Sequence, residues 1–192
     1  MTAHSNEVAP GSWHRADGFS VLETLIALGI LAVVAAGVLP LGMLAVTTTE
    51  NQGHLMARTT EYAQDKLEQL QVLAFGDAQS DTRVFPALST GGTGLAPGGS
   101  ADTAAPQNGY VDYLDLDGNV LPSAGGAPAN WYYRRVWLVE MVAAGNTSCP
   151  ALLAPAGCLK RITVSATVRA AAAGGLGAIP RSTVSALKSY PF

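Results

Sequence analysis

The sequence predicts an α+β fold in which a long N-terminal transmembrane helix packs on a C-terminal antiparallel β-sheet head. One apolar run occupies residues 25–46 without interruption. Segments in which β-branched and aromatic residues alternate with polar residues occur in the second half of the chain. A chain of 192 residues that is 48% hydrophobic can form one compact head with an additional segment.

The apolar run predicts a helix that crosses a membrane. No charged residue occurs from Thr24 to Thr49, and the 22 residues of the run cover about 33 Å at helical rise, enough to span a hydrocarbon core. The alternative is an ordinary secretory signal peptide. That interpretation requires a basic start and a shorter apolar stretch, whereas residues 1–18 carry Arg15 against Glu7 and Asp17.

A carboxylate stands just inside the hydrophobic segment, at Glu23. Carrying a carboxylate into a bilayer costs about 2.5–3.5 kcal/mol on insertion scales, so such a residue usually has a partner. A local explanation is also open. Ser20 and Glu23 fit the S-x-x-E capping box, and the helix dipole favours an acid in the first turn.

The residues in front of the apolar run form a short motif, Gly18-Phe19-Ser20-Val21-Leu22-Glu23. Together with the long apolar helix, this motif resembles the N-terminal signal of type IV prepilins and pseudopilins. The resemblance implies that a prepilin peptidase cuts between Gly18 and Phe19, and that Phe19 becomes the N-methylated first residue. It also implies that Glu23 pairs with the new N-terminal amine of a neighbouring subunit during assembly.

The same resemblance implies a pilin-like division of the chain: a leader at 1–18, a transmembrane and assembly helix at 19–46, a continuation at 47–75 and a head at 76–192. Helix-weakening residues at Gly37, Pro40 and Gly42 are expected to loosen this helix on assembly. The helix is expected to run from about Ser20 to Ala74, with a break near Gly53 as the alternative.

Helical spacing in the continuation defines two stripes. One holds Leu55, Thr59, Tyr62 and Lys66, and the other, largely apolar, holds Met56, Ala63, Leu67, Leu70 and Ala74. The second half of the helix is therefore expected to pack against the head.

The first part of the head is expected to be a glycine-rich loop at 89–109, with little to bury, followed by a hairpin at 110–121. Asp115, Asp117 and Asn119 suit a tight turn in that hairpin. They are also weak calcium candidates, although the rest of an EF-hand loop, including its closing Glu, is missing.

Residues 131–142 and 159–169 predict two strands that pair antiparallel, and 182–189 predicts a final edge strand. Cys149 and Cys158, the only cysteines, lie in or beside the connection between the first two. A disulfide is expected if the head lies outside the cytoplasm, with free buried thiols as the alternative.

Charge is unevenly distributed. Residues 50–130 hold ten acidic and three basic residues, whereas residues 131–192 hold one acidic and seven basic residues. The basic residues of the paired strands stand among aromatic residues and are expected to point outward, where they could contact an acidic neighbouring subunit or DNA: Arg134, Arg135, Lys160, Arg161 and Arg169.

No enzyme constellation is present. His4 and His14 lie in the expected leader, which leaves His54 as the one histidine of the mature chain. We expect no cofactor and no small-molecule substrate. By resemblance, the chain is a minor pilin, with a type II secretion pseudopilin or a membrane-tethered DNA- or surface-binding module as alternatives.

The resemblance also implies partners and a location. The partners are the prepilin peptidase, other pilin or pseudopilin subunits, the inner-membrane assembly platform and membrane lipid. The chain would sit in the inner membrane with its head in the periplasm, and then enter a pilus or pseudopilus that can reach the cell surface.

Overall fold

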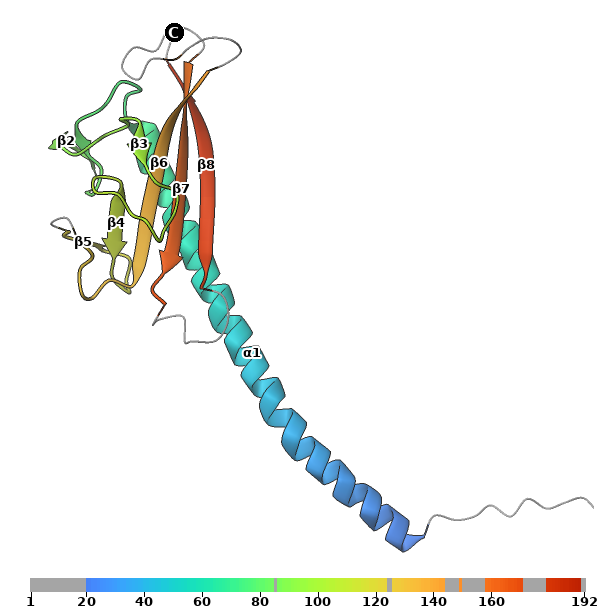
Figure 1. The fold of residues 1–192 in the computed structure, drawn as a ribbon. Helices are drawn as coiled ribbons and strands as arrows, with labels where there is room; N and C mark the ends of the chain where they lie inside the picture. The colour runs from blue at the N-terminus through green and yellow to red at the C-terminus, as the bar shows by residue number, and fades with distance from the viewer. Residues whose placement is uncertain are drawn as a thin grey trace, which may run out of the picture. The chain divides into compact units, whose positions relative to one another are not determined.

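The chain divides into two units, Met1–Val46 and Thr47–Phe192, and helix α1 (Val21–Val72) has residues in both (Figure 1). The computed structural model describes residues 20–84, 86–123, 126–143, 149, 158–170 and 179–190. The expected α+β class is confirmed, because α1 precedes a set of antiparallel strands. The helix is continuous through Gly53, where a break was the alternative.

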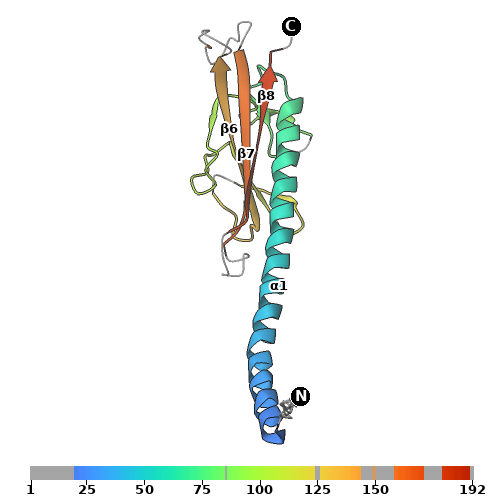
Figure 2. The same cartoon turned by 90° about the vertical axis from the view of Figure 1, so that its right-hand side faces the viewer.

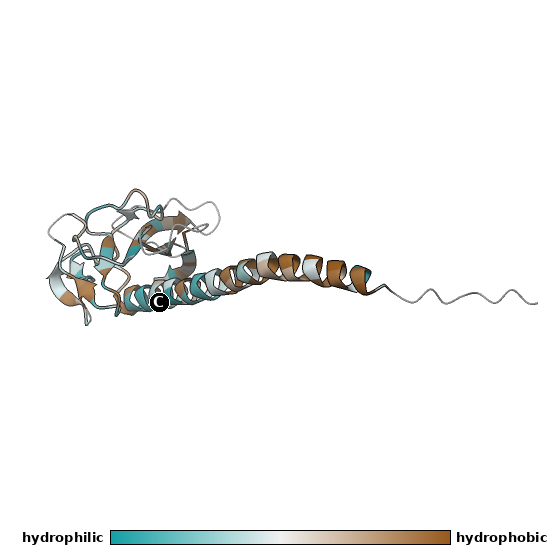
Figure 3. Ribbon diagram, turned by 90° about the horizontal axis from the view of Figure 1, so that it is seen from below, coloured by the Kyte–Doolittle hydropathy of each residue, from teal (hydrophilic) through white to brown (hydrophobic). Residues whose placement is uncertain are grey.

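In the first unit, α1 is apolar on all sides, as the brown half of the helix in Figure 3 shows. It is also the one helix in the described part of the chain that is long and apolar enough to cross a membrane. Apolar side chains on every side require an apolar environment such as lipid or other helices. The exposed ones are Val21, Leu22, Leu25, Ile26, Leu28, Ile30, Leu31, Val33, Val34, Val38, Leu39, Leu41, Met43, Leu44 and Val46.

The second unit is built on an antiparallel sheet with the path β5-β4-β6-β7-β8, and β3 pairs with β6 beside that path. The strands of this sheet are β3 (Gly98–Gly99), β4 (Val111–Leu114), β5 (Val120–Leu121), β6 (Tyr133–Ala143), β7 (Cys158–Val168) and β8 (Arg181–Ser189). Two short strands, β1 (Ser80–Asp81) and β2 (Leu88–Gly91), pair separately.

These pairings confirm the expected hairpin and the three expected strand segments. Strands β4 and β5 pair across the predicted turn. Strands β6 and β7 pair from Tyr133 opposite Val168 to Ala143 opposite Cys158. Strand β8 lies at the end of the sheet path, as predicted for an edge strand.

The second half of α1 covers one face of this sheet, and Figure 2 shows the helix alongside β8. Alternate residues of a strand point to opposite faces, so Trp137 faces the helix while Val136 faces away. The helix-side core joins residues of α1 to residues of the sheet and of the loop before it: Leu55, Tyr62, Ala63, Leu70, Leu95, Tyr110, Leu114, Tyr133, Trp137, Val139, Ile162, Val164, Ala166 and Val168.

The buried face of α1 combines the two stripes that helical spacing defined. Leu55, Thr59, Tyr62 and Lys66 of the first stripe are buried, and Ala63 and Leu70 of the second stripe are buried beside them. Met56 remains 46% exposed. The contact face is broader than either stripe because a helix lying on a flat sheet buries residues on both sides of its contact line.

The expectation that the segment 89–109 is a loop with little to bury is wrong in part. Leu95 is fully buried in the core, and β3 within the segment pairs with β6. Gly99 allows this pairing. It has a φ of +90°, and a Cβ there would lie 2.1 Å from the carbonyl oxygen of Trp137, so only glycine fits.

The expectation that the basic residues of the paired strands point outward is wrong for two of them. Arg135 and Lys160 are 1% and 4% exposed. They lie on the helix-side face of the sheet because their strand positions alternate with those of Arg134 and Arg161. Each therefore requires an internal partner.

Candidate functional site

The N-terminus of α1 is capped by Ser20. The Ser20 hydroxyl oxygen accepts a hydrogen bond from the Leu22 amide at 3.2 Å, and the Ser20 carbonyl accepts one from the Thr24 amide at 3.1 Å. Gly18 and Phe19, the expected cleavage and methylation residues, lie outside the described residues, as does the rest of the expected leader.

Glu23 occupies the first turn of α1 and is exposed. Within the described part of the chain its carboxylate makes no hydrogen bond, so the reciprocal half of the expected capping box is missing there. Its position near the positive end of the helix dipole is favourable, but that interaction leaves the carboxylate oxygens available. The Glu23 carboxylate can therefore accept a hydrogen bond from a donor that lies outside the described residues.

The helix-weakening residues Gly37, Pro40 and Gly42 all lie within continuous helix. A Cβ at Gly37 or Gly42 would meet no atom within 4 Å, so neither glycine is required by packing inside this chain. Pro40 lacks an amide hydrogen and leaves one helical carbonyl without its usual donor. Loosening of this part of the helix on assembly stays a prediction.

The expected disulfide is confirmed. Cys149 and Cys158 are bonded, with their Cα atoms 5.7 Å apart. Cys158 is the first residue of β7 and is 1% exposed. The bond therefore ties Cys149, within the connection between the two longest strands, to the start of β7.

The three calcium candidates form a hydrogen-bonded turn between β4 and β5. One Asp115 carboxylate oxygen accepts hydrogen bonds from the amides of Asp117 and Asn119, at 3.0 and 2.8 Å. The other accepts one from the Asn119 side chain at 3.0 Å, and this bond holds the pKa of Asp115 below its usual range. The described residues contain no group of three or more His, Cys, Asp or Glu side chains arranged to hold a metal ion.

A buried ionic network lies between α1 and the sheet, and sequence reasoning missed it. Lys66 Nζ lies 2.7 Å from Asp112 Oδ2, with both side chains fully buried. Arg135 contributes one guanidinium nitrogen to the same oxygen at 2.9 Å and another to Asp65 at 2.7 Å. Lys66 also donates to the carbonyl of Thr82 and lies 4.1 Å from the centre of the Trp137 ring.

Burial dominates the ionisation of Lys66. Removal from water lowers the pKa of its ammonium to about 8, although the Asp112 carboxylate acts in the opposite direction. The ion pair and the lowered pKa are compatible, because the desolvation cost of a fully buried ammonium can exceed the attraction of one carboxylate.

A second buried cation, Lys160, uses only carbonyl groups. Its ammonium donates to the carbonyl oxygens of Phe75 and Leu95 at 2.6 and 2.7 Å, and lies 4.8 Å from the centre of the Phe75 ring. Burial lowers the pKa of Lys160 from its ordinary value. Lys160 thereby holds the segment after α1 and the glycine-rich segment against β7.

One signal in the sequence pointed to the network. Lys66 continues the stripe of Leu55, Thr59 and Tyr62 and is its one charged member. A charge on a buried stripe requires a buried partner. The partner, Asp112, could not be selected among the acidic residues of the head without knowing which face of β4 it occupies.

Residues 13–39 match the family described as the prokaryotic N-terminal methylation motif. Comparisons with curated proteins and with solved structures found no match. The motif, the apolar helix and the antiparallel head define a class of subunits that carry an N-terminal anchor and a folded head. Within that class, the motif supports a type IV pilin-like prepilin.

The family is structural and not enzymatic. Its motif implies processing by a prepilin peptidase and assembly with other pilins. The apolar first part of α1 agrees with membrane anchoring before that assembly.

Proposed function

We propose that the chain is a minor pilin of a type IV pilus, incorporated through its N-terminal helix after cleavage between Gly18 and Phe19. The observation that carries the proposal is the methylation motif at residues 13–39, which includes the start of α1, where apolar side chains lie on all sides of the helix. A helix of this kind can leave the lipid bilayer and pack against the helices of neighbouring subunits without exposing its apolar surface to water.

Glu23 has the central role in this proposal. Phe19, once cleaved, presents a positively charged N-terminal amine, and Glu23 lies four residues further along. An amine from one subunit and the Glu23 carboxylate from the next neutralise each other in an apolar surrounding, where an unpaired charge is costly. The pairing fixes the position of each incoming subunit along the helix axis.

The disulfide supports a head outside the cytoplasm. Bonds such as Cys149–Cys158 form and persist in the periplasm and on cell surfaces. We infer that the head faces the periplasm before assembly and the surface of the pilus afterwards, with the inner-membrane assembly platform as a partner.

A membrane-tethered DNA- or surface-binding module is the second candidate. The Trp131 ring lies near two guanidinium groups. The Cζ atoms of Arg134 and Arg169 lie 5.1 and 5.5 Å from the centre of the ring. Arginine and aromatic groups arranged in this way can stack on nucleic acid bases. Loss of DNA binding in Trp131→Ala, with assembly retained, would favour this candidate.

The direct test combines two substitutions and one control in the native host. Gly18→Val is expected to abolish cleavage, measured as loss of the mature mass that begins at N-methylated Phe19. Glu23→Gln is expected to be cleaved normally but to be at least about tenfold depleted from sheared filaments, since an ionic partner in an apolar core is lost. Glu50→Gln, on the same helix, should assemble like the wild type.

Two outcomes count against the proposal. A mature chain that begins elsewhere excludes the cleavage site, and normal incorporation of Glu23→Gln excludes the assembly role of Glu23. A strain in which the gene is deleted distinguishes a minor pilin from a type II secretion pseudopilin. If the chain is a minor pilin, the strain should lose its pili and keep normal secretion.

A further inference from the structure

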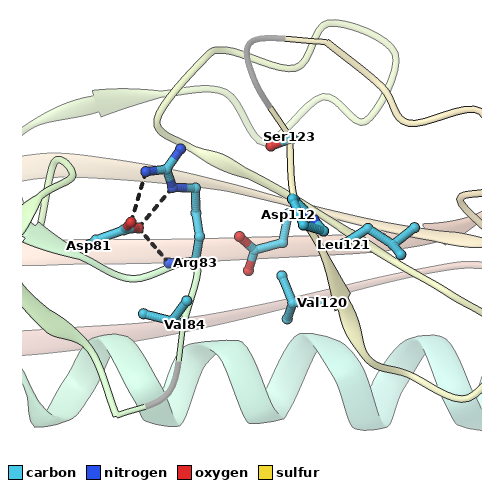
Figure 4. A pocket seen from close by; sticks show the side chains of 8 residues that line it. Asp81, Arg83, Val84, Asp112, Val120, Leu121 and Ser123 are labelled. Carbon is cyan, nitrogen blue, oxygen red and sulfur yellow. Dashed lines mark hydrogen bonds and ion pairs between the residues drawn. The ribbon is translucent and has the colours of Figure 1, made fainter.

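The head contains a hollow of about 670 Å³ that none of the roles above uses. It lies between the segment that follows β1 and the residues around β5, and Figure 4 shows the side chains around it. Its volume is within the range of about 300–1,000 Å³ typical of small-molecule sites. The described residues that line it are Asp81, Arg83, Val84, Asp112, Val120, Leu121, Pro122 and Ser123.

Asp112 gives this hollow a hydrogen-bond acceptor that lacks a donor. The residue is 1% exposed, and its Oδ2 atom receives both Lys66 and Arg135. Its Oδ1 atom is buried and has no hydrogen-bond partner among the described residues. Figure 4 shows the carboxylate directed toward the space between Arg83 and Val120. A buried carboxylate oxygen without a hydrogen-bond donor costs free energy. A ligand in the hollow that donates a hydrogen bond to this oxygen would therefore bind favourably.

The charges around the hollow already compensate one another. Arg83 donates from Nε and Nη2 to the two carboxylate oxygens of Asp81, at 2.8 and 2.7 Å. Asp112 is held by Lys66 and Arg135, and Arg135 is also paired with Asp65. A cationic ligand would approach three cations, and an anionic ligand would approach the carboxylates of Asp81 and Asp112. Neither sign of charge is favoured over an uncharged ligand.

Apart from Ser123, the other described lining residues are apolar. They are Val84, Val120, Leu121 and Pro122, and Val84 and Val120 are 43% and 39% exposed. Exposed apolar side chains beside an acceptor with no donor suit a ligand whose body is apolar and whose polar end includes a donor.

We propose that the hollow is a binding site for an uncharged organic molecule with an apolar body and a polar end that carries an N–H or O–H donor, as in a primary amide. The donor bonds to Asp112 Oδ1, and the apolar body packs on Val84, Val120 and Leu121. This function is additional to assembly and does not depend on it.

The test uses four probes with a common ring: benzamide, methyl benzoate, benzoate and benzylammonium. Each is titrated into the 15N-labelled full chain in detergent micelles, and the amide chemical shifts of Val84, Asp112, Leu121 and Ser123 are followed. Benzamide is expected to shift these amides with a Kd at least about tenfold lower than those of the other three. Methyl benzoate and benzoate lack a donor, and a site built to accept a donor rejects an analogue without one. Benzylammonium has donors but brings a positive charge toward Arg83, Lys66 and Arg135.

Matched variants locate the binding. Val120→Arg places a charge in the hollow at a partly exposed position, so the chain is expected to fold and benzamide binding to be lost. Leu187→Arg introduces the same group at a residue that is 60% exposed on β8, at the opposite end of the sheet path, and binding should be unchanged.

Three results would overturn the proposal. They are an equal Kd for benzamide and methyl benzoate, an absence of shifts with all four probes, and shifts that persist in Val120→Arg. The last result would mean that the probe binds elsewhere, as in the micelle.

Discussion

Lys66 of α1 and Asp112 of β4 form an ion pair of 2.7 Å in which both side chains are completely buried. The pair joins the helix to the sheet, and Arg135 on the neighbouring strand binds the same carboxylate oxygen. A buried ion pair contributes little net stability compared with apolar side chains of the same shape, but removing one partner is costly because a charge then remains buried without compensation.

The lowered pKa of Lys66 makes stability depend on pH above neutrality. Its pKa is about 8 in the folded chain and near its ordinary value when unfolded, so between these values the unfolded chain binds more protons. Stability is therefore expected to rise with pH from about 8 toward 10, by a few kcal/mol in all. Urea unfolding of the head, followed by tryptophan fluorescence at pH 7.5, 8.5 and 9.5, measures the rise.

Lys66→Met is the control for this prediction, because methionine fills similar volume without a titrating group. Its free energy of unfolding should rise less steeply over the same pH range. The measurements stop below pH 10 because tyrosine ionisation then affects stability. Burial raises the pKa of Tyr133 to about 12, so above pH 10 the unfolded chain loses this proton before the folded chain does, and the free energy of unfolding falls. Parallel curves for both proteins would show that Lys66 does not lose its proton in this range.

The disulfide is expected to stabilise the head against unfolding. Closing the short loop between Cys149 and Cys158 should contribute about 2–3 kcal/mol through the entropy of the unfolded chain. The double variant Cys149→Ser, Cys158→Ser should lose this amount, measured by urea unfolding. Adding reductant should weaken the wild type equally and leave the double variant unchanged. A double variant as stable as the wild type would contradict this assignment.

The turn between β4 and β5 can be tested by separating its two aspartates. Asp115 accepts three hydrogen bonds within the turn, so Asp115→Ala should lower the Tm. Asp117 contributes its amide to the turn, and Asp117→Ala should leave the Tm nearly unchanged. Calcium chloride added to the wild type should not alter the Tm. A rise in Tm that both variants abolish would instead support a calcium site.

Features that depend on local sequence were predicted well. The apolar run gave α1, and β-branched alternation gave β6, β7 and β8, because burial on one face requires those periods. The disulfide followed from two cysteines and the expected compartment. The capping of α1 was predicted in part, since Ser20 binds the Leu22 amide and the reciprocal bond from Glu23 is missing among the described residues.

Features that depend on the face of a strand were not predicted. Arg135 and Lys160 were expected at the surface because charged residues usually are, yet both are buried on the helix-side face of the sheet. Register decides this, since a shift by one residue moves a side chain to the other face. The burial of Leu95 was also not predicted, because its glycine-rich neighbours indicated an exposed loop.

Lys66 and Lys160 both hold loop segments through backbone carbonyls, those of Thr82, Phe75 and Leu95. Every residue type carries such a carbonyl. The anchoring of these segments therefore does not require particular side chains at the anchored positions, provided that the backbone follows the same course. Side chains at these three positions can therefore be exchanged without removing the acceptors that the two lysines bind.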